Sequence, residues 1–152
     1  MNLRSIANII IFSISIINNT MAETKRVNPF MEEYNTPFGT IPFDKIKNED
    51  YMEALRYGIK REKEEVDAII ANEERPTFEN TILALENCGR QLEKVQYPFY
   101  NMLSAESNDT LQRIAEEIAP EETELSNYIS MNAKLFDRVK KVYDERENLN
   151  LD

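Results

Sequence analysis

Few residues of this chain have side chains suited to catalysis. The 152 residues include one cysteine, Cys88, and no histidine. Without histidine the chain cannot build a Ser-His-Asp or Cys-His arrangement, nor the usual zinc-ligand sets. Any chemistry would have to rest on carboxylates, lysines and tyrosines.

Adjacent glutamate pairs are the most frequent carboxylate pattern. Neighbouring residues on a helix point about 100° apart, so the two members of a pair do not converge on one site. We interpret these pairs as solvated helix faces. The carboxylate-plus-histidine motif of di-iron helical bundles cannot occur here. The pairs are Glu32–Glu33, Glu64–Glu65, Glu73–Glu74, Glu116–Glu117 and Glu121–Glu122.

Two single residues interrupt apolar patterns. Glu62 falls inside an apolar stripe, and we interpret it as a rim residue or a solvent-mediated partner of Arg61 or Lys63. Cys88 lies among apolar residues and is interpreted as a small buried hydrophobe rather than a reactive thiol. A single cysteine also excludes an intrachain disulfide.

Tyr97, Tyr100 and Asn101 flank Pro98. Two phenols beside a kinked helix could line a groove, although the pattern favours core packing. No nucleophile, base and orienting group come together anywhere in the sequence. We therefore assign no catalytic, cofactor-binding or metal-binding residue to this chain.

The overall charge limits the possible partners. Lys and Arg number 18 against 28 Asp and Glu, which gives a net charge of −10. Nucleic acids and anionic membrane surfaces require clustered basic residues, so we expect neither as a partner. The acidic balance favours solubility and tolerates basic partners.

Residues 1–22 have the order of a secretory signal peptide. Arg4 precedes an apolar run from Ile6 to Ile17, and cleavage after Ala22 is expected. A span needs roughly 20 apolar residues, so this run is too short to cross a bilayer. The expectation is a periplasmic or secreted protein that does not associate with a membrane once the signal is removed. If Met21 is the true start, the product is cytoplasmic.

Residues 23–47 lack helical periodicity and contain three prolines. A disordered tail would not carry so many large apolar residues. We predict an extended, packed strap in which each aromatic enters a groove on something larger. The apolar residues concerned are Phe30, Phe38, Phe43 and Ile46.

Residues 48–147 are predicted to form a helical region. Asn48 is expected to cap a helix over 49–72, and Thr77 one over 78–104 that kinks at Pro98. A third helix starts near Asp109, and its apolar stripe keeps phase across Pro120, which favours one kinked helix over two.

Asn132 is expected to cap a fourth helix, and residues 148–152 to form a trailing loop. No segment alternates in the strand period. The predicted class is therefore all-α, with long amphipathic helices packed antiparallel. The inner face of the fourth helix is predicted to comprise Leu135, Phe136, Val139, Val142 and Tyr143.

Three sequence segments carry a resemblance to a known family. They are FGTIPFDKIKNEDYMEAL, PTFENTILALE and LSAESNDTLQRIAEEIAPEETELSNYISMNAKLFDRVKKVY, in that order. Together they resemble the N-terminal part of the thimet-oligopeptidase-like zinc metallopeptidases. Within that family the similarity points to bacterial peptidyl-dipeptidases (dipeptidyl carboxypeptidases) and oligopeptidase A. It covers roughly residues 28–152.

This resemblance implies an almost wholly helical, two-lobed peptidase with a deep channel, in which a His-Glu-x-x-His helix and a later glutamate bind zinc. Those catalytic residues lie far downstream in the family, and none can be carried over to a position here. The resemblance thus implies a monomeric peptidase acting on short peptides. This chain would be its non-catalytic N-terminal part, shaping one channel wall and completed by a C-terminal catalytic region.

Two other readings stay open at the level of sequence. The chain could be a stand-alone, exported acidic helical module that binds a partner and has no enzymatic role. It could also be a regulator that mimics one lobe of such a peptidase and binds its missing half. A part of a larger body should expose apolar surface, whereas a stand-alone module should have a polar outer face.

Overall fold

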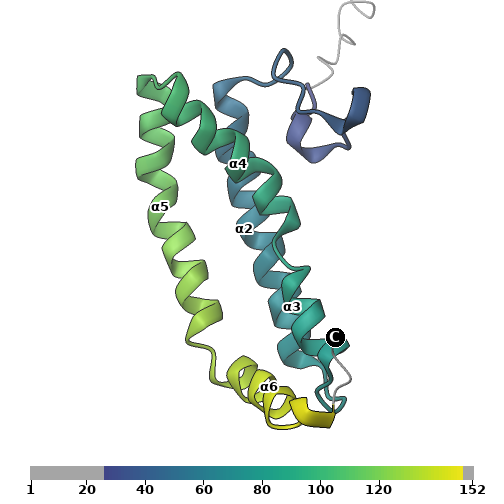
Figure 1. Ribbon diagram of the computed structural model, residues 1–152. Helices are drawn as coiled ribbons and strands as arrows, with labels where there is room; N and C mark the ends of the chain where they lie inside the picture. The colour runs from purple at the N-terminus through teal and green to yellow at the C-terminus, as the bar shows by residue number, and fades with distance from the viewer. Residues whose placement is uncertain (1–25, 149–152) are drawn as a thin grey trace, which may run out of the picture.

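The computed structural model describes residues 26–148, and every regular element in that range is helical (Figure 1), which confirms the all-α class. The predicted signal peptide lies outside the described residues. Short 3-10 turns occur at Pro29–Met31, Pro37–Gly39 and Arg146–Asn148. The longer elements are α2 (Asn48–Ala71), the π-helix η3 (Phe78–Leu83), α3 (Ala84–Glu86), α4 (Arg90–Ala105), α5 (Asp109–Ser130) and α6 (Ala133–Asp144).

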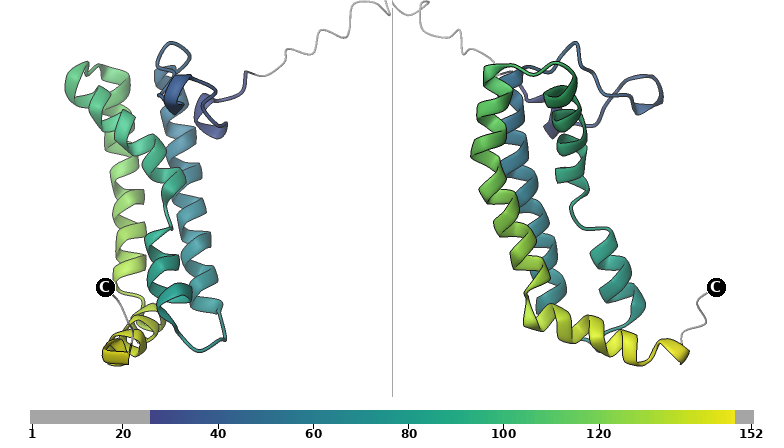
Figure 2. Two further views of the ribbon diagram at one scale, coloured as in Figure 1. Left: turned by 45° about the vertical axis from the view of Figure 1, so that its right-hand side comes forward. Right: turned by 60° about the vertical axis from the view of Figure 1, so that its left-hand side comes forward.

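The long helices form an up-and-down arrangement. In Figure 1, α2 runs downward, η3, α3 and α4 return upward, and α5 runs downward again. Both α4 and α5 pack against α2, and α6 lies across the lower end (Figure 2). The predicted antiparallel packing of consecutive long helices is confirmed. Among the residues described, no helix has both the length and the apolar character needed to cross a bilayer.

The first long helix begins one residue earlier than predicted. Lys47, not Asn48, occupies the N-cap position, and its N–H donates to the Asp50 carboxylate at 2.7 Å. Asp50 and Glu49 place negative charge at the positive end of the helix dipole. Gly58 on α2 permits a close approach of α4, because a Cβ there would lie 2.7 Å from the Cα of Leu92.

The predicted helix over 78–104 is interrupted at Asn87–Gly89 rather than at Pro98. Gly89 has φ +78, a left-handed conformation that ends helices and that side chains disfavour. Pro98 is buried inside α4, which continues to Ala105. The break at Gly89 was thus missed at the level of sequence, and the kink expected at Pro98 stays a prediction.

The last two helices follow the sequence prediction closely. α5 is a single helix through Pro120, as favoured, and Asn108 Oδ1 accepts the N–H of Leu111 at 3.1 Å. Asn132 caps α6 by accepting the N–H of Leu135 at 3.1 Å.

The predicted inner face of α6 is only half correct. Leu135 and Val142 are buried and Val139 is half-buried. Phe136 and Tyr143 are instead 63% and 60% exposed. The periodicity places all five on one broad apolar arc, but the rest of the described chain covers only one side of it.

The strap over 23–47 is packed in part, over the residues from Arg26 onward. Phe30 is fully buried, with its ring centroid 5.2 Å from that of Tyr51. Phe43 is about half exposed, and Phe38 is 104% exposed with φ +61. The expectation that every aromatic enters a groove on a larger body is wrong for Phe30, which completes the core of this chain itself.

Candidate functional site

The glutamate pairs behave as solvated surfaces where they lie far from a neighbouring helix. Both members are exposed in the pairs at 32–33, 73–74 and 116–117. Glu121 and Glu122 are half-buried but diverge. Glu121 pairs with Arg56 on α2 at 2.8 Å, and Glu122 accepts from Tyr100 on α4 at 2.5 Å. The divergence follows from the angle between neighbouring helical residues.

Glu62 is half-buried beside the break between α3 and α4. Burial raises its pKa, and the charges of Glu65 and Glu93 raise it further. Its carboxylate lies against Gly89, and the carboxylate of Glu65 accepts the Gly89 N–H at 3.0 Å. The pair thus places negative charge at the N-terminus of α4, where the helix dipole favours it.

The expected partners of Glu62 are engaged elsewhere. Arg61 pairs with Glu64 at 3.0 Å, and Lys63 pairs with Asp67 at 2.8 Å. Glu62 is half-buried, as expected of a rim residue, and no direct ion pair joins it to Arg61 or Lys63 within residues 26–148. The i,i+3 and i,i+4 spacings along one exposed helix face bring those other pairs together first.

Cys88 is half-buried, and its thiol donates to the carbonyl oxygen of Ala84 at 3.3 Å. Burial raises the thiol pKa, and the charges of Glu65 and Glu62 raise it further. A thiol kept protonated in this way is a poor nucleophile. The geometry agrees with the packing role predicted for this residue.

The tyrosines around Pro98 are not core residues. Tyr97 is 65% exposed, and Asn101 is exposed as well. Tyr100 packs edge-on against Phe99 with 5.0 Å between ring centroids, and burial raises the pKa of its phenol. Core packing was thus the wrong expectation for Tyr97. The inner face of α4 is occupied instead by its buried residues, which include Leu92 and Phe99.

A groove of about 510 Å³ lies between α2 and α5. Lys63 sits over the ring of Tyr128, 4.2 Å from its centroid, and the Tyr128 hydroxyl donates to the Asp67 carboxylate. Lys63 and Asp67 are paired with each other, and Tyr128 is hydrogen-bonded to Asp67. The groove therefore presents a concave surface with polar edges, and these side chains are not free to react. Its lining residues are Ile59, Lys63, Glu121, Glu124, Leu125, Asn127 and Tyr128.

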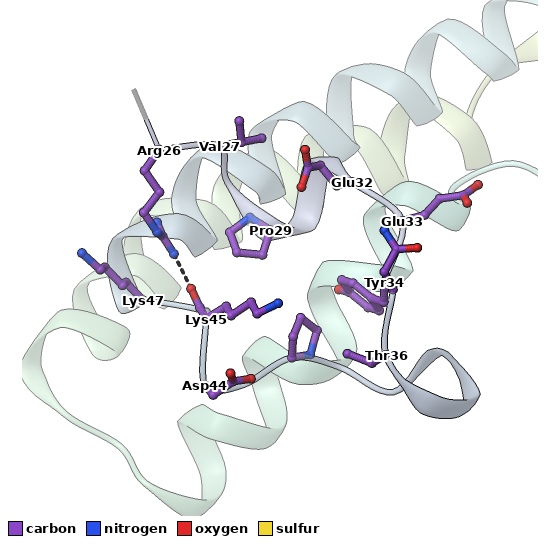
Figure 3. A pocket seen from close by; sticks show the side chains of 12 residues that line it. Arg26, Val27, Pro29, Glu32, Glu33, Tyr34, Thr36, Asp44, Lys45 and Lys47 are labelled. Carbon is purple, nitrogen blue, oxygen red and sulfur yellow. Dashed lines mark hydrogen bonds between the residues drawn. The ribbon is translucent and has the colours of Figure 1, made fainter. Parts of the chain in front are cut away.

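A second cleft, of about 440 Å³, opens within the strap and is lined only by residues of its own segment, 26–47 (Figure 3). Arg26 closes one side by pairing with Asp50 at 2.7 Å and by donating to the Lys45 carbonyl. The Tyr34 hydroxyl is buried without a protein hydrogen-bond partner among the described residues, and burial raises its pKa to about 12. Lys94 lies over the Tyr34 ring, 4.4 Å from its centroid.

Sequence reasoning missed both clefts. The groove depends on residues from two helices whose register no local pattern specifies. The cleft depends on the path of an irregular segment. The signals that could have pointed to them were weak: the Lys63 and Asp67 spacing on α2, and the Pro-rich turn around Pro37.

The residues of this chain do not fit a zinc site. Zinc in peptidases is bound by histidine and carboxylate ligands, and the chain contains no histidine. Within residues 26–148, no three Cys, Asp or Glu side chains are grouped closely enough to hold a metal ion. No reaction step is therefore assigned to zinc on this chain.

Comparison with known proteins identifies relatives. No protein-family model matches the chain. A dipeptidyl carboxypeptidase of Escherichia coli (strain K12) is 41% identical over 126 residues, which is 83% of this chain. One of Salmonella typhimurium (strain LT2) is 38% identical over 125 residues, or 82% of the chain. The chain is a homologue of the dipeptidyl carboxypeptidases.

The match covers most of this chain but only a small part of each relative. This chain spans only 18% of the length of each dipeptidyl carboxypeptidase that it matches. The match therefore shows homology to a small part of these proteins.

Proposed function

We propose that this chain is the N-terminal, non-catalytic helical part of a zinc metallopeptidase of the dipeptidyl carboxypeptidase type. The observation that carries the proposal is the unequal match: most of this chain aligns with less than a fifth of each relative. The lack of a zinc-ligand set in this chain supports it, since the catalytic chemistry then belongs to the remaining region. In this proposal the complete polypeptide binds zinc outside this part and releases dipeptides from the C-termini of short peptides.

The role proposed for this part is to shape one wall of the substrate channel. Long helices packed on one another provide a rigid surface, which positions a substrate better than loops do. The groove between α2 and α5 is the proposed peptide-facing surface, because it combines apolar residues such as Ile59 and Leu125 with polar edges. The complete enzyme is proposed to be monomeric and, if residues 1–22 are a signal peptide, periplasmic or secreted.

A chimera tests this function directly. The 126-residue matched segment of the E. coli relative is exchanged for the corresponding segment of this chain. We expect the folded chimera to release dipeptides from N-acylated peptides and to lose that activity with a zinc chelator. The isolated 152-residue chain, as the matched control, should release none. Cleavage by the isolated chain, or a folded but inactive chimera, contradicts the proposal.

A stand-alone binding module is the second candidate, and one observation favours it. The strap end forms a complete core, with Phe30 fully buried by residues of this chain alone. If the isolated chain unfolds in a single cooperative transition and binds no apolar dye, this candidate gains at the expense of the first. Strong dye binding by the folded chain would favour the peptidase-part proposal.

A further inference from the structure

The α6 helix carries three distinct faces. At about 100° per residue, Leu135, Arg138 and Val142 share the face that is buried against the rest of the chain. Phe136, Val139 and Tyr143 fall at spacings of three and four on the neighbouring face, which we call the α6 outer face. Charged residues occupy the remaining arc. An apolar arc this wide is typical of a helix covered on two sides.

The outer face is uncovered in this structure. Phe136 and Tyr143 remain 63% and 60% exposed, and Val139 is half-buried. Met131, at the corner between α5 and α6, is 78% exposed. Single exposed apolar residues are ordinary, but these lie on successive turns of one short segment. Large aromatic rings arranged in this way usually supply the anchors of an interface.

Charge does not mark the outer face. Within its 12 residues α6 carries four basic and two acidic side chains. At about 100° per residue, Lys134 and Lys141 lie roughly 160° and 140° around the helix from Phe136, on the side away from the outer face. A complementary surface is therefore defined by its apolar character.

We propose that the α6 outer face docks into an apolar groove on the catalytic region of the same polypeptide. This inference rests on the function proposed above. The length of the relatives argues for this occupant, since this chain spans only 18% of each and over four fifths of such a protein lies outside it. A second copy of this chain is the alternative occupant, and the sedimentation measurement below distinguishes the two.

The test compares the same substitutions in the isolated chain and in the chimera described above. Phe136→Asp and Tyr143→Asp are made in both, together with Tyr97→Asp as a control of matched exposure on α4. In the isolated chain none of the three should shift the thermal midpoint, because the rings are already exposed. In the chimera, Phe136→Asp and Tyr143→Asp should clearly lower the midpoint, and Tyr97→Asp should not.

Several results overturn the docking. They are an unchanged midpoint for Phe136→Asp and Tyr143→Asp in the folded chimera, and an equal loss caused by Tyr97→Asp. A third is an isolated chain that sediments as a dimer and becomes monomeric with Phe136→Asp, since the occupant is then a second copy. Midpoints report docking and dipeptide release reports the proposed function, so the two can fail separately.

A chimera that does not fold moves the test to separate chains. The 152-residue chain is then mixed with the E. coli relative from which the matched segment has been deleted, and complex formation is followed by sedimentation. We expect the unsubstituted chain and Tyr97→Asp to bind, and Phe136→Asp to bind at least about tenfold more weakly, the loss typical of a central interface residue. Failure of the unsubstituted chain to bind overturns the docking.

Discussion

The two ends of this helical bundle are stabilised in different ways. At the strap end, eleven buried residues form one continuous cluster that includes the mutually tilted rings of Phe30, Tyr51 and Phe99. At the α6 end, the buried cluster comprises only Val66, Ile69 and Leu135. The strap end is therefore closed by hydrophobic packing from this chain alone, whereas the α6 end is thinly packed and leaves part of its apolar arc uncovered.

Polar contacts compensate at the α6 end. Arg138 is buried, and its guanidinium donates to the carbonyl oxygen of Asn72 at 2.6 Å and to the Thr81 hydroxyl at 3.3 Å. The Arg138 side chain thereby donates a hydrogen bond to the carbonyl oxygen of the residue that caps the C-terminus of α2, and it also bonds to η3. The comparison teaches that α6 is positioned by directional bonds more than by buried area.

The largest effect is expected at the strap end. Phe30→Ala should lower the free energy of unfolding of the chain by about 3–5 kcal/mol, the usual cost of deleting a fully buried phenylalanine. Urea unfolding followed by circular dichroism measures the change. Phe38→Ala is the matched control, since Phe38 is fully exposed and its loss should change stability little. Equal effects of the two substitutions would mean that the strap is not part of the core.

Arg138→Met tests the polar character of the α6 end. Removing the guanidinium leaves the partly buried carbonyl oxygen of Asn72 and the buried Thr81 hydroxyl without their donor, which should cost about 2–3 kcal/mol. Amide hydrogen exchange should show that α6 loses protection while the strap end keeps it. Arg138→Lys is the control, because it keeps the charge but cannot reach several acceptors at once. Uniform loss of protection across the chain would contradict the separation of the two ends.

Gly89→Ala probes the break that lies between the two ends. A side chain at φ +78 is strained by about 1–2 kcal/mol, and an added Cβ would lie 2.7 Å from the Glu62 carboxylate. Gly39→Ala is the matched control, since it has φ +66 but nothing within 4 Å of the added Cβ. In urea titrations Gly89→Ala should cost more than Gly39→Ala. The difference measures the contact with Glu62.

Much of the fold could be predicted from the sequence because local signals agreed with it. The apolar stripes of α2 and α5 and the cap at Asn132 depend on neighbours a few residues away. The break at Gly89 was missed, because a glycine within an apolar stripe does not by itself reveal that it adopts the left-handed conformation that stops a helix.

The surfaces could be predicted less well. Periodicity identifies an apolar arc, as at Phe136, but not which part of that arc this chain covers. The direct partners of Arg61 and Lys63 were not anticipated for a similar reason, because several acids lie one turn away on the same helix. The groove depends on tertiary contacts between α2 and α5, and the cleft depends on the path of the irregular segment 26–47, so no periodic pattern could have located either.

The smallest predicted effect is an opposite pH dependence of two carboxylates, Glu62 beside the break at Gly89 and Asp50 at the strap end. The pKa of Glu62 is raised above its ordinary value of 4.5 in the folded chain, chiefly by burial. The folded state therefore holds the proton more tightly than the unfolded state, and this group makes the chain less stable as pH rises above 4.5. Glu62→Gln should thus gain a little stability at neutral pH, and the gain should vanish below pH 4.5.

Asp50 at the strap end provides the matched opposite case. Its hydrogen bond from Arg26 lowers its pKa below 3.8, so its ionised form stabilises the fold above pH 3.8, and this contribution is lost as pH falls further. Asp50→Asn should lose stability at neutral pH and approach the parent in strong acid. Urea midpoints measured from pH 3 to pH 8 compare the two variants. If both shift in the same direction at neutral pH, the two carboxylates are not in the opposite environments that distinguish a satisfied ion pair from a half-buried, unpaired acid.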